Sequence, residues 1–395
     1  MTIKQWVSVG LIYCLGVLAF VSFGSMGALA KDFGNAVHVS AQSAGAAFGF
    51  MFFPTLGAVA VGWASDRVGT RPILLFGAAC LFFDDIANLK VNTLGWLMAD
   101  NFVQGLGIVS LLVGGQTALA QMTSGKTQAG VMALWATTTG VGLSLGSLLS
   151  GDLADTPVWR LCFVIEGVAA LCLAIATLFF IRPRTAAAAA AAHRGSFVEL
   201  LSESKALRLC LAFTLFSILA VGATSASPFY LSRIHNVPIG EIGRMAALAA
   251  PAGIAGSFAT GYLLSQSVTP RNIVIMYIAI ALVNTPLLYR EGTDLRFLAI
   301  SMITWQFCVG AANAFTYTML PSLINNKQNI GTATGVLNNG AGLASVGGVP
   351  LFFWIATLSQ ASIAFIALSA ACLICSALVM PIWRLTGVAQ PQPIH

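Results

Sequence analysis

Apolar and polar residues alternate along the chain in long blocks rather than in short amphipathic periods. Twelve mostly apolar segments follow one another with short polar connections between them. A membrane-spanning α-helix needs about 20 consecutive apolar residues, so the pattern predicts twelve spanning helices. The segments are residues 6–30, 41–64, 73–89, 95–121, 127–151, 159–181, 207–231, 240–266, 272–289, 296–320, 330–356 and 360–383.

Composition agrees with a chain whose solvent is lipid. The 395 residues are 57% hydrophobic and only 8% charged, whereas soluble domains carry about 25% charged residues. The first segment is longer than the core of a signal peptide, so we expect it to be retained. The net charge of +6 does not indicate nucleic-acid binding, because the basic residues form no stripe with interleaved aromatic residues.

The distribution of basic residues predicts the orientation. With the amino terminus placed in the cytoplasm, twelve of the 19 Lys and Arg residues fall on the cytoplasmic side of the predicted helices. Cytoplasmic loops of membrane proteins carry an excess of Lys and Arg. The chain is therefore expected to lie in a bacterial inner membrane, as a monomer in the lipid bilayer, with both termini cytoplasmic.

A polar stretch near the middle of the chain predicts two halves. Residues 182–206 are basic, include a run of seven alanines, and read as a cytoplasmic linker. This gives an N-terminal six-helix bundle at 1–181 and a C-terminal six-helix bundle at 207–384. The tail, 385–395, is too polar and proline-rich to order itself.

The two halves share a glycine pattern. Gly140 and Gly142 are matched 200 residues later by Gly340 and Gly342, and Gly146 continues the first run. Small residues at such spacing let membrane helices pack closely, so these five glycines are predicted to be helix-packing residues. Chance alignment among the 39 glycines is the alternative to an internal duplication. Repeats with a solute site at their interface are typical of secondary transporters.

The connection between the second and third segments carries a recognisable motif. It reads Gly62-Trp-Ala-Ser-Asp66-Arg67-Val-Gly69-Thr-Arg71. This resembles the cytoplasmic signature G-x-x-x-D-R-x-G-R-[RK] of the major facilitator superfamily, with Thr70 in place of a frequent basic residue. The resemblance implies an all-α membrane fold of two pseudo-symmetric six-helix bundles, a central cavity lined by helices one, four, seven and ten, and alternating access.

The same motif has a physical interpretation as a gate. Gly62 and Gly69 allow a sharp turn between helices. Asp66 can sit against the positive end of a neighbouring helix, and Arg67 and Arg71 can reach carbonyls or carboxylates on the facing half. Such a clasp would hold the cytoplasmic side closed and release when the halves rock.

Two further stretches are loosely similar to the drug/proton antiporter branch of that family. Asn101-Phe-Val-Gln104-Gly105-Leu-Gly107 is similar to R-x-x-Q-G-x-G, with Asn101 in place of the arginine. The run from Gly140 to Gly146 is similar to the antiporter glycine motif but lacks its proline.

Four acidic residues in the first half fall within predicted spanning segments: Asp84, Asp85, Asp100 and Glu166. Ionisable groups in a bilayer are costly and are functional by default. We therefore predict them to be proton-coupling residues. Transport is expected to be driven by an ion gradient, with protons as the favoured ion, and to need no cofactor. The alternative for the aspartates is a solvated place at the outer headgroup boundary, near Lys90. Sodium coupling through carboxylates and backbone carbonyls stays open.

The second half carries no such acids, only amides deep in its helices, among them Asn284, Asn338 and Asn339. The hypothesis is that the first half handles protons while the second shapes the solute pocket. No deep Lys or Arg offers an anion site, which favours neutral, zwitterionic or amphiphilic small molecules. The predicted solute-binding residues are Phe20, Phe23, Asn101, Gln104, Tyr230, Trp305, Gln306 and Asn313.

Other function classes find little support. Neither a phosphate-cradling G-x-x-x-x-G-K-[ST] loop nor a nucleophile–base pair is present, so ATP hydrolysis and enzyme activity are not expected. Cys372 and Cys375 form a lone C-x-x-C without a nearby histidine, so no metal site is predicted. The sequence favours a proton-coupled exporter of a drug, metabolite or siderophore. Proton-coupled uptake of a nutrient or metal chelate, and a non-transporting receptor, are the alternatives.

Overall fold

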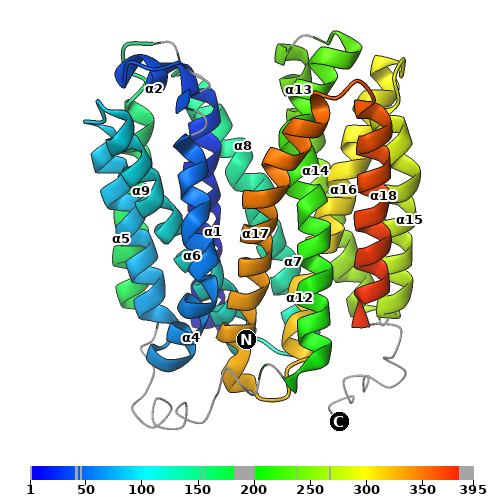
Figure 1. Ribbon diagram of the computed structural model, residues 1–395. Coiled ribbons are helices and arrows are strands. Elements are labelled where there is room, and N and C mark those ends of the chain that lie inside the picture. Colours follow the sequence, from blue (N-terminus) through cyan, green and yellow to red (C-terminus); the bar gives the residue numbers. More distant parts are fainter. Residues whose placement is uncertain are drawn as a thin grey trace. The chain divides into compact units, whose positions relative to one another are not determined.

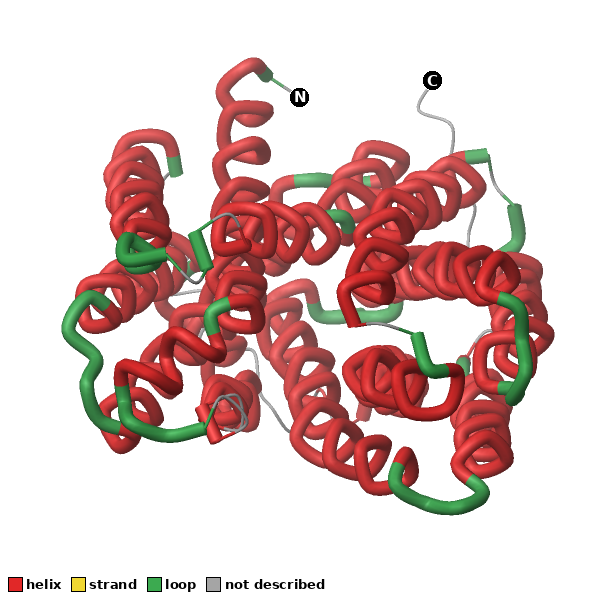
Figure 2. The backbone as a smooth tube through the Cα atoms, turned by 90° about the horizontal axis from the view of Figure 1, so that it is seen from above, coloured by secondary structure: helices red, strands yellow, loops and turns green. Residues whose placement is uncertain are grey.

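The computed structural model confirms an all-helical chain. It describes residues 2–40, 43–44, 47–151, 153–154, 156–181, 200, 202–237, 239–266 and 268–381, and no strand occurs among them. Helices joined by short loops make up almost all of this described chain (Figure 2). Most of the predicted linker, 182–199 and 201, and the predicted tail, 385–395, lie outside the described residues.

The helices follow the predicted segments in order (Figure 1). In the first half of the sequence they are α1 (Ile3–Ala28), α2 (Ala30–Ala36), the 3₁₀-helix η1 (Phe48–Gly57), α4 (Ala58–Val68), α5 (Thr70–Asn88), α6 (Leu94–Met122), α7 (Gly125–Ala136), α8 (Thr138–Gly151) and α9 (Leu161–Phe180). In the second half they are α12 (Ser204–Ser217), the π-helical η3 (Ile218–Ala223), α13 (Thr224–His235), α14 (Ile239–Ser265), α15 (Pro270–Tyr289), α16 (Leu295–Met319), the 3₁₀-helices η4 (Leu320–Ser322) and η5 (Lys327–Asn329), α17 (Ile330–Ala356) and α18 (Ala361–Val379).

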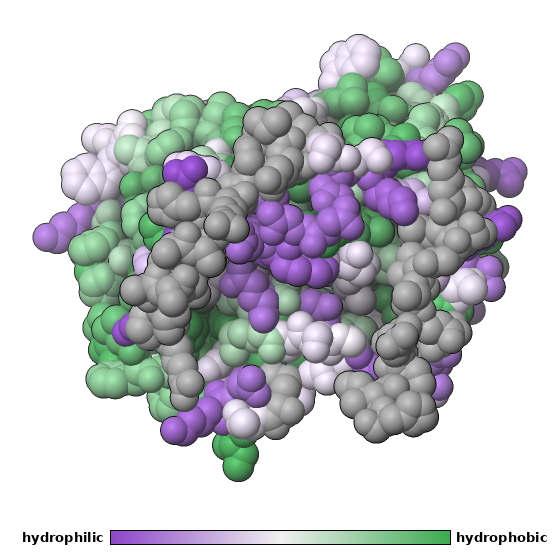
Figure 3. Space-filling view, turned by 90° about the horizontal axis from the view of Figure 1, so that it is seen from below, coloured by the Kyte–Doolittle hydropathy of each residue, from purple (hydrophilic) through white to green (hydrophobic). Residues whose placement is uncertain are grey.

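Ten helical stretches of the described chain are long and apolar enough to cross a membrane. The helices α5 and α14, of 19 and 27 residues, account for the remaining two predicted segments. The surface agrees with this interpretation, because hydrophobic side chains cover large areas of it (Figure 3).

The chain forms two compact units. The first unit comprises residues 1–122, 138–200 and 326–342, and the second comprises 123–137, 201–325 and 343–395. In the first unit α1 packs on α6, α8 and α9, and α5 packs on α6 and α9. In the second unit α14 packs on α7 and α16, and α15 packs on α16 and α18.

Contacts inside the two units recur about 200 residues apart. In the first unit Ser8 Oγ donates to Phe180 O at 3.1 Å, joining the start of α1 to the end of α9. In the second unit Arg208 Nε donates to Val379 O at 3.0 Å, joining the start of α12 to the end of α18. Matching bonds at matching positions support the internal duplication that the glycine pattern indicates.

The backbones of α14 and α16 lie in close contact at glycines in the second unit. A Cβ atom on Gly310 would overlap the backbone of Gly253, and one on Gly256 would overlap Phe307 O. Such close helix contacts are what small residues provide inside membranes, where no hydrophobic force acts between helices. The second unit therefore depends on these glycines for its packing.

We expect Gly310→Ala to destabilise the protein, because the added methyl group must push α14 and α16 apart at a cost of about 1–3 kcal/mol. Thermal unfolding in detergent, followed by tryptophan fluorescence, should show a melting temperature a few degrees lower. Gly347→Ala is the matched control, since nothing lies within 4 Å of a Cβ at that position. Equal melting temperatures for the two variants would contradict this packing account.

Candidate functional site

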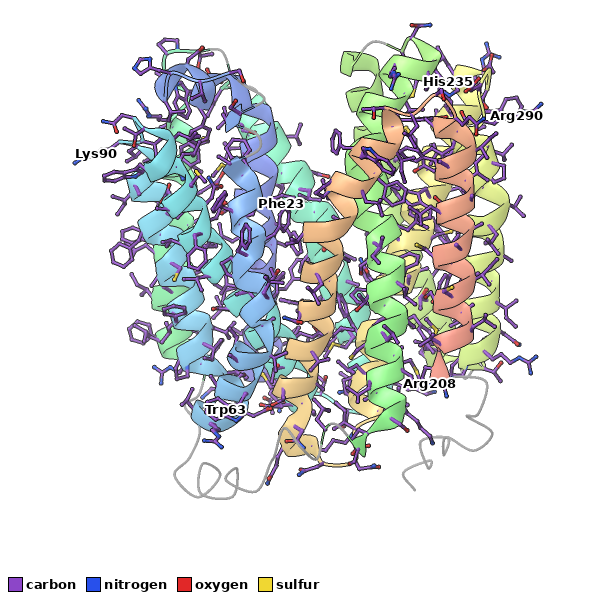
Figure 4. All side chains as sticks on the ribbon, in the orientation of Figure 1. Phe23, Trp63, Lys90, Arg208, His235 and Arg290 are labelled. Atoms are coloured by element: carbon purple, nitrogen blue, oxygen red, sulfur yellow. The ribbon has the colours of Figure 1, made fainter. Side chains whose placement is uncertain are left out.

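The four predicted acids come together inside the first unit. Asp84 and Asp85 lie on α5, Asp100 on α6 and Glu166 on α9, and their side chains are 1%, 2%, 5% and 2% exposed. The solvated alternative for the aspartates does not match this burial. Lys90 is exposed near one end of the first unit, and Trp63, labelled on α4, lies near the other end (Figure 4). We refer to the four residues as the acid cluster.

The pairing of Asp84 with Asp100 follows from how α5 meets α6. A Cβ atom on Gly77 would lie 3.0 Å from Gly107 O, so the two helices cross closely at these glycines. Asp84 stands seven residues after Gly77 and Asp100 seven residues before Gly107. Since the helices run antiparallel, both carboxyl groups are about 10 Å from the crossing in the same direction.

The two carboxyl groups lie close enough to interact electrostatically. Two ionised carboxylates this close repel each other, so a proton on one of them stabilises the pair. Asn88 Nδ2 also donates to Asp84 Oδ1 at 3.3 Å. Asp84 and Asp100 are therefore a buried pair in which two negative charges at once are unfavourable.

Asp85 and Glu166 form the other side of the acid cluster. A Cβ atom on Gly167 would lie 3.2 Å from the Cβ of Asp85, so the missing side chain lets Asp85 lie directly against α9. Asp85 interacts electrostatically with both Glu166 and Asp100. The four acids are thus close enough for the charge on one to affect the others.

The cluster is rich in acceptors and poor in donors. Several of its buried oxygens have no hydrogen-bond partner among the described residues: Asp84 Oδ2, Asp85 Oδ1 and Oδ2, Asn88 Oδ1, Asp100 Oδ2, Asn101 Oδ1, Gln104 Oε1 and Glu166 Oε2. Within the same described chain, no group of three or more His, Cys, Asp or Glu residues is arranged to hold a metal ion. Ionised carboxylates without a counter-charge are costly to bury, so this arrangement favours bound protons.

Helix α1 closes the cluster with polar groups that sequence reasoning missed. Ser25 Oγ donates to Glu166 Oε1, and Ser22 Oγ donates to Leu18 O at 3.3 Å. Gln104 Nε2 donates to Ser22 O at 3.2 Å. Serines are common packing residues in membrane helices, so nothing in the sequence singled out these two. Their spacing of three residues, on one face of α1, was the available signal.

The predicted gating motif is also built within the first unit. Asp66 Oδ1 accepts from Gly331 N at 2.8 Å, and Asp66 Oδ2 accepts from Thr332 N at 2.6 Å and Thr332 Oγ1 at 2.7 Å. These donors form the first turn of α17, where backbone N–H groups have no partner within the helix. A Cβ atom on Gly62 would overlap Gly331, so glycine lets α4 lie against that turn.

The remaining motif residues have local roles. Gly69 takes a φ of +90° between α4 and α5, a backbone conformation that favours glycine. The guanidinium of Arg67 lies 3.9 Å from the ring centre of Trp63. Arg71 Nη2 donates to Leu178 O at 2.7 Å, at the end of α9. For Arg71 the expectation of a carbonyl on the facing half was wrong, because its partner belongs to the same half of the sequence.

Two amides assigned by the sequence to the second half lie in the first unit. Asn338 Nδ2 donates to Thr334 O at 2.9 Å and to Gln116 Oε1 at 3.4 Å. Asn339 Nδ2 donates to Leu56 O and Thr55 O. A Cβ atom on Gly342 would overlap Thr55 as well. The first part of α17 is therefore bound to first-half helices through side-chain amides and a glycine contact.

The other predicted packing glycines lie on α8 and α17. Cβ atoms on Gly142 and Gly146 would overlap Phe20 and Val21 O of α1, which gives both glycines a packing role. Gly140 O accepts from Ser144 Oγ at 2.7 Å, and Gly340 is buried.

The residues predicted to bind solute differ in how accessible they are. Asn101 and Gln104 are buried beside the acid cluster, and Asn101 Nδ2 donates to Leu97 O at 2.7 Å. In the second unit Tyr230 is buried with its hydroxyl bonded to Tyr289 O and Ser362 Oγ. Trp305 Nε1 donates to Thr224 Oγ1 at 3.0 Å. Only Phe20, Phe23, Gln306 and Asn313 of the set are half-buried.

Comparisons with known proteins agree with this architecture. Residues 9–349 match the Major Facilitator Superfamily. Multidrug resistance protein MdtL of Escherichia coli O81 (strain ED1a) is 25% identical over 305 residues, covering 75% of this chain and 74% of that protein. The human organic anion transporter MFSD10 (TETRAN) superposes with a TM-score of 0.76 at 16% identity, over 97% of this chain and 99% of that one. The proton:xylose symporter XylE superposes with a TM-score of 0.75 at 14% identity, over 96% of each chain.

Proposed function

The chain belongs to the major facilitator superfamily and is a transporter rather than an enzyme; on this premise, we propose that it exports a small organic solute across the inner membrane in exchange for protons. Both termini are proposed to lie in the cytoplasm, with 1–181 and 207–384 as the two halves and 182–206 as the linker. The protein is proposed to act as a monomer in lipid.

The observation that carries proton coupling is the pairing of Asp84 with Asp100. Two buried carboxylates repel each other, so a proton on one of them stabilises the pair, and Asp85 and Glu166 lie within electrostatic range of it. Losing one proton would leave uncompensated charge in a buried site, which is unfavourable in the absence of a cation. A solute-dependent change in the surroundings of the cluster would therefore change its proton occupancy.

The proposed gate is the contact of Asp66 with the first turn of α17. Its three hydrogen bonds join α4 to a helix from the other half of the sequence. Alternating access requires such contacts to form in one state and break in another. We assign the clasp of Asp66, Gly331 and Thr332 to the state in which the cytoplasmic side is closed.

The proposed direction of transport is based on the relatives of the chain. The relative MdtL is named a multidrug resistance protein, which favours export. XylE, a proton:xylose symporter, shares the fold alone, so proton-coupled uptake is the second candidate. For solute contact we propose the half-buried Phe20, Phe23, Gln306 and Asn313, since the more buried predicted residues already have partners. This set suits a neutral, zwitterionic or amphiphilic solute.

The test is solute-dependent proton movement in liposomes that contain a pH-sensitive dye. A panel of drugs, organic acids, amino acids and siderophores is screened with the wild-type protein. An exporter of the proposed kind moves protons against the direction of solute flux, whereas a symporter moves both in the same direction. Solute flux without proton movement would contradict the proposal, and binding without flux would indicate a receptor.

A further inference from the structure

The hydroxyl group of Ser25 is placed at a junction of three helices. Its oxygen lies 3.1 Å from Val21 O on α1, 3.4 Å from Gly146 O on α8, and within hydrogen-bond distance of Glu166 Oε1 on α9. All three neighbours are acceptors, and a serine hydroxyl has a single hydrogen to donate. The hydroxyl can therefore donate to only one of these acceptors at a time.

The protonation state of Glu166 determines which acceptor receives the hydrogen. An ionised carboxylate is the strongest of the three acceptors, because hydrogen bonds to charged groups are about twice as strong as neutral ones. Once Glu166 takes up a proton, its oxygen becomes a weaker acceptor and the backbone carbonyls compete. The hydroxyl then turns toward Gly146 O or Val21 O, without any change in covalent bonds.

The contact between α1 and α8 is sensitive to such a change. A Cβ atom on Gly24 would lie 2.7 Å from Leu143 O, and Cβ atoms on Gly142 and Gly146 would overlap α1 itself. Helices packed this closely have discrete arrangements rather than continuous freedom. A hydrogen bond gained or lost at Gly146 O therefore changes how α1 packs against α8.

We propose that Ser25 is a positioning residue that transmits the protonation state of Glu166 to the α1–α8 contact. This inference rests on the proposed proton coupling and deepens it, because it names the group through which the acid cluster acts on the bundle. Ser22 donates its hydroxyl hydrogen to Leu18 O and accepts from Gln104 through its backbone carbonyl, and it lacks a contact with α8 among the bonds described.

The test needs no transported solute. Infrared difference spectra of the purified protein, titrated with acid and base alone, report the C=O stretch of protonated carboxyl groups, and Glu166→Gln identifies the band of Glu166. In Ser25→Ala the pH at half-intensity of that band should rise by about one unit, the tenfold change in proton affinity expected when one hydrogen bond to the charged form is lost. Ser25→Thr keeps the hydroxyl and should restore the wild-type titration.

A second readout follows the helices. Hydrogen exchange of α8 amides, corrected for intrinsic pH dependence, should change across the Glu166 titration in the wild type but not in Ser25→Ala. Ser8→Ala is the matched control, because Ser8 is another α1 serine that bonds Lys4 O and Phe180 O, away from the cluster.

Two outcomes would overturn the inference in distinguishable ways. A Glu166 band whose titration is the same in wild type, Ser25→Ala and Ser8→Ala would show that Ser25 only packs, and would leave proton coupling standing. A wild-type spectrum that contains no titrating Glu166 band would remove both the relay and the proposed role of Glu166.

Discussion

Replacing Asp66 with asparagine is expected to reduce solute flux by about 30-fold, because it removes the charge that joins α4 to the start of α17. The carboxylate accepts three hydrogen bonds there and faces the positive end of the helix. Hydrogen bonds to a charged group contribute about 1.5–3 kcal/mol, and 2 kcal/mol changes the ratio of two conformational states about 30-fold. Initial rates in liposomes measure the effect.

Asp294→Asn is the matched control for this variant. Asp294 also caps a helix, with Oδ1 accepting from Arg296 N at 2.8 Å at the start of α16, but it is exposed. Its replacement should leave flux within about twofold, since exposed caps contribute only about 1 kcal/mol. Thr332→Val removes one donor, and its solute flux should lie between those of Asp66→Asn and Asp294→Asn. Flux in Asp66→Asn that equals flux in Asp294→Asn would contradict the gating role.

Glu166→Gln and Asp84→Asn are expected to abolish accumulation against a gradient while preserving solute exchange. The amides keep the shape of the carboxyl groups but cannot bind or release a proton. In the wild type, a difference of one pH unit drives up to about tenfold accumulation for each proton exchanged. Both variants should show no accumulation, and each should still exchange labelled for unlabelled solute at equal pH.

The control for the acid cluster is Glu203→Gln. Glu203 accepts from Asn325 N at 3.1 Å and Asn325 Nδ2 at 2.8 Å, and these bonds are exposed. It should accumulate solute as the wild type does. If Glu166→Gln and Asp84→Asn also accumulate solute normally, the coupling ion binds elsewhere. If both lose exchange as well, the acids serve the structure rather than coupling.

The fold could be predicted from the sequence because lipid imposes the same requirement on every segment. A spanning helix must satisfy its own backbone, so each long apolar block had one available structure. The predicted segment 330–356 coincides with α17, Ile330–Ala356. Departures occur where local chemistry intervenes. The segment predicted from residue 41 is interrupted by a 3₁₀ stretch, Phe48–Gly57, which contains Pro54, before α4 begins at Ala58.

The candidate site was accessible only in part. Buried acids are conspicuous in an apolar chain, so Asp84, Asp85, Asp100 and Glu166 could be selected from composition. Their pairing could not, because it depends on where α5 crosses α6, and a shift of one turn would separate Asp84 from Asp100. Asn338 and Asn339 show the same limit. Sequence position assigned them to the second half, whereas their hydrogen-bond partners Gln116, Thr55 and Leu56 belong to the first.

The most direct test of the central account is proton release by the purified protein in weakly buffered detergent when solute is added. The solute is the first that the liposome panel identifies. Because coupling between two ligands is reciprocal, a solute that is exchanged for protons must displace them on binding. The account predicts release of about one proton per wild-type molecule and none from Glu166→Gln. Equal release from both proteins, or solute binding without any release, would contradict it.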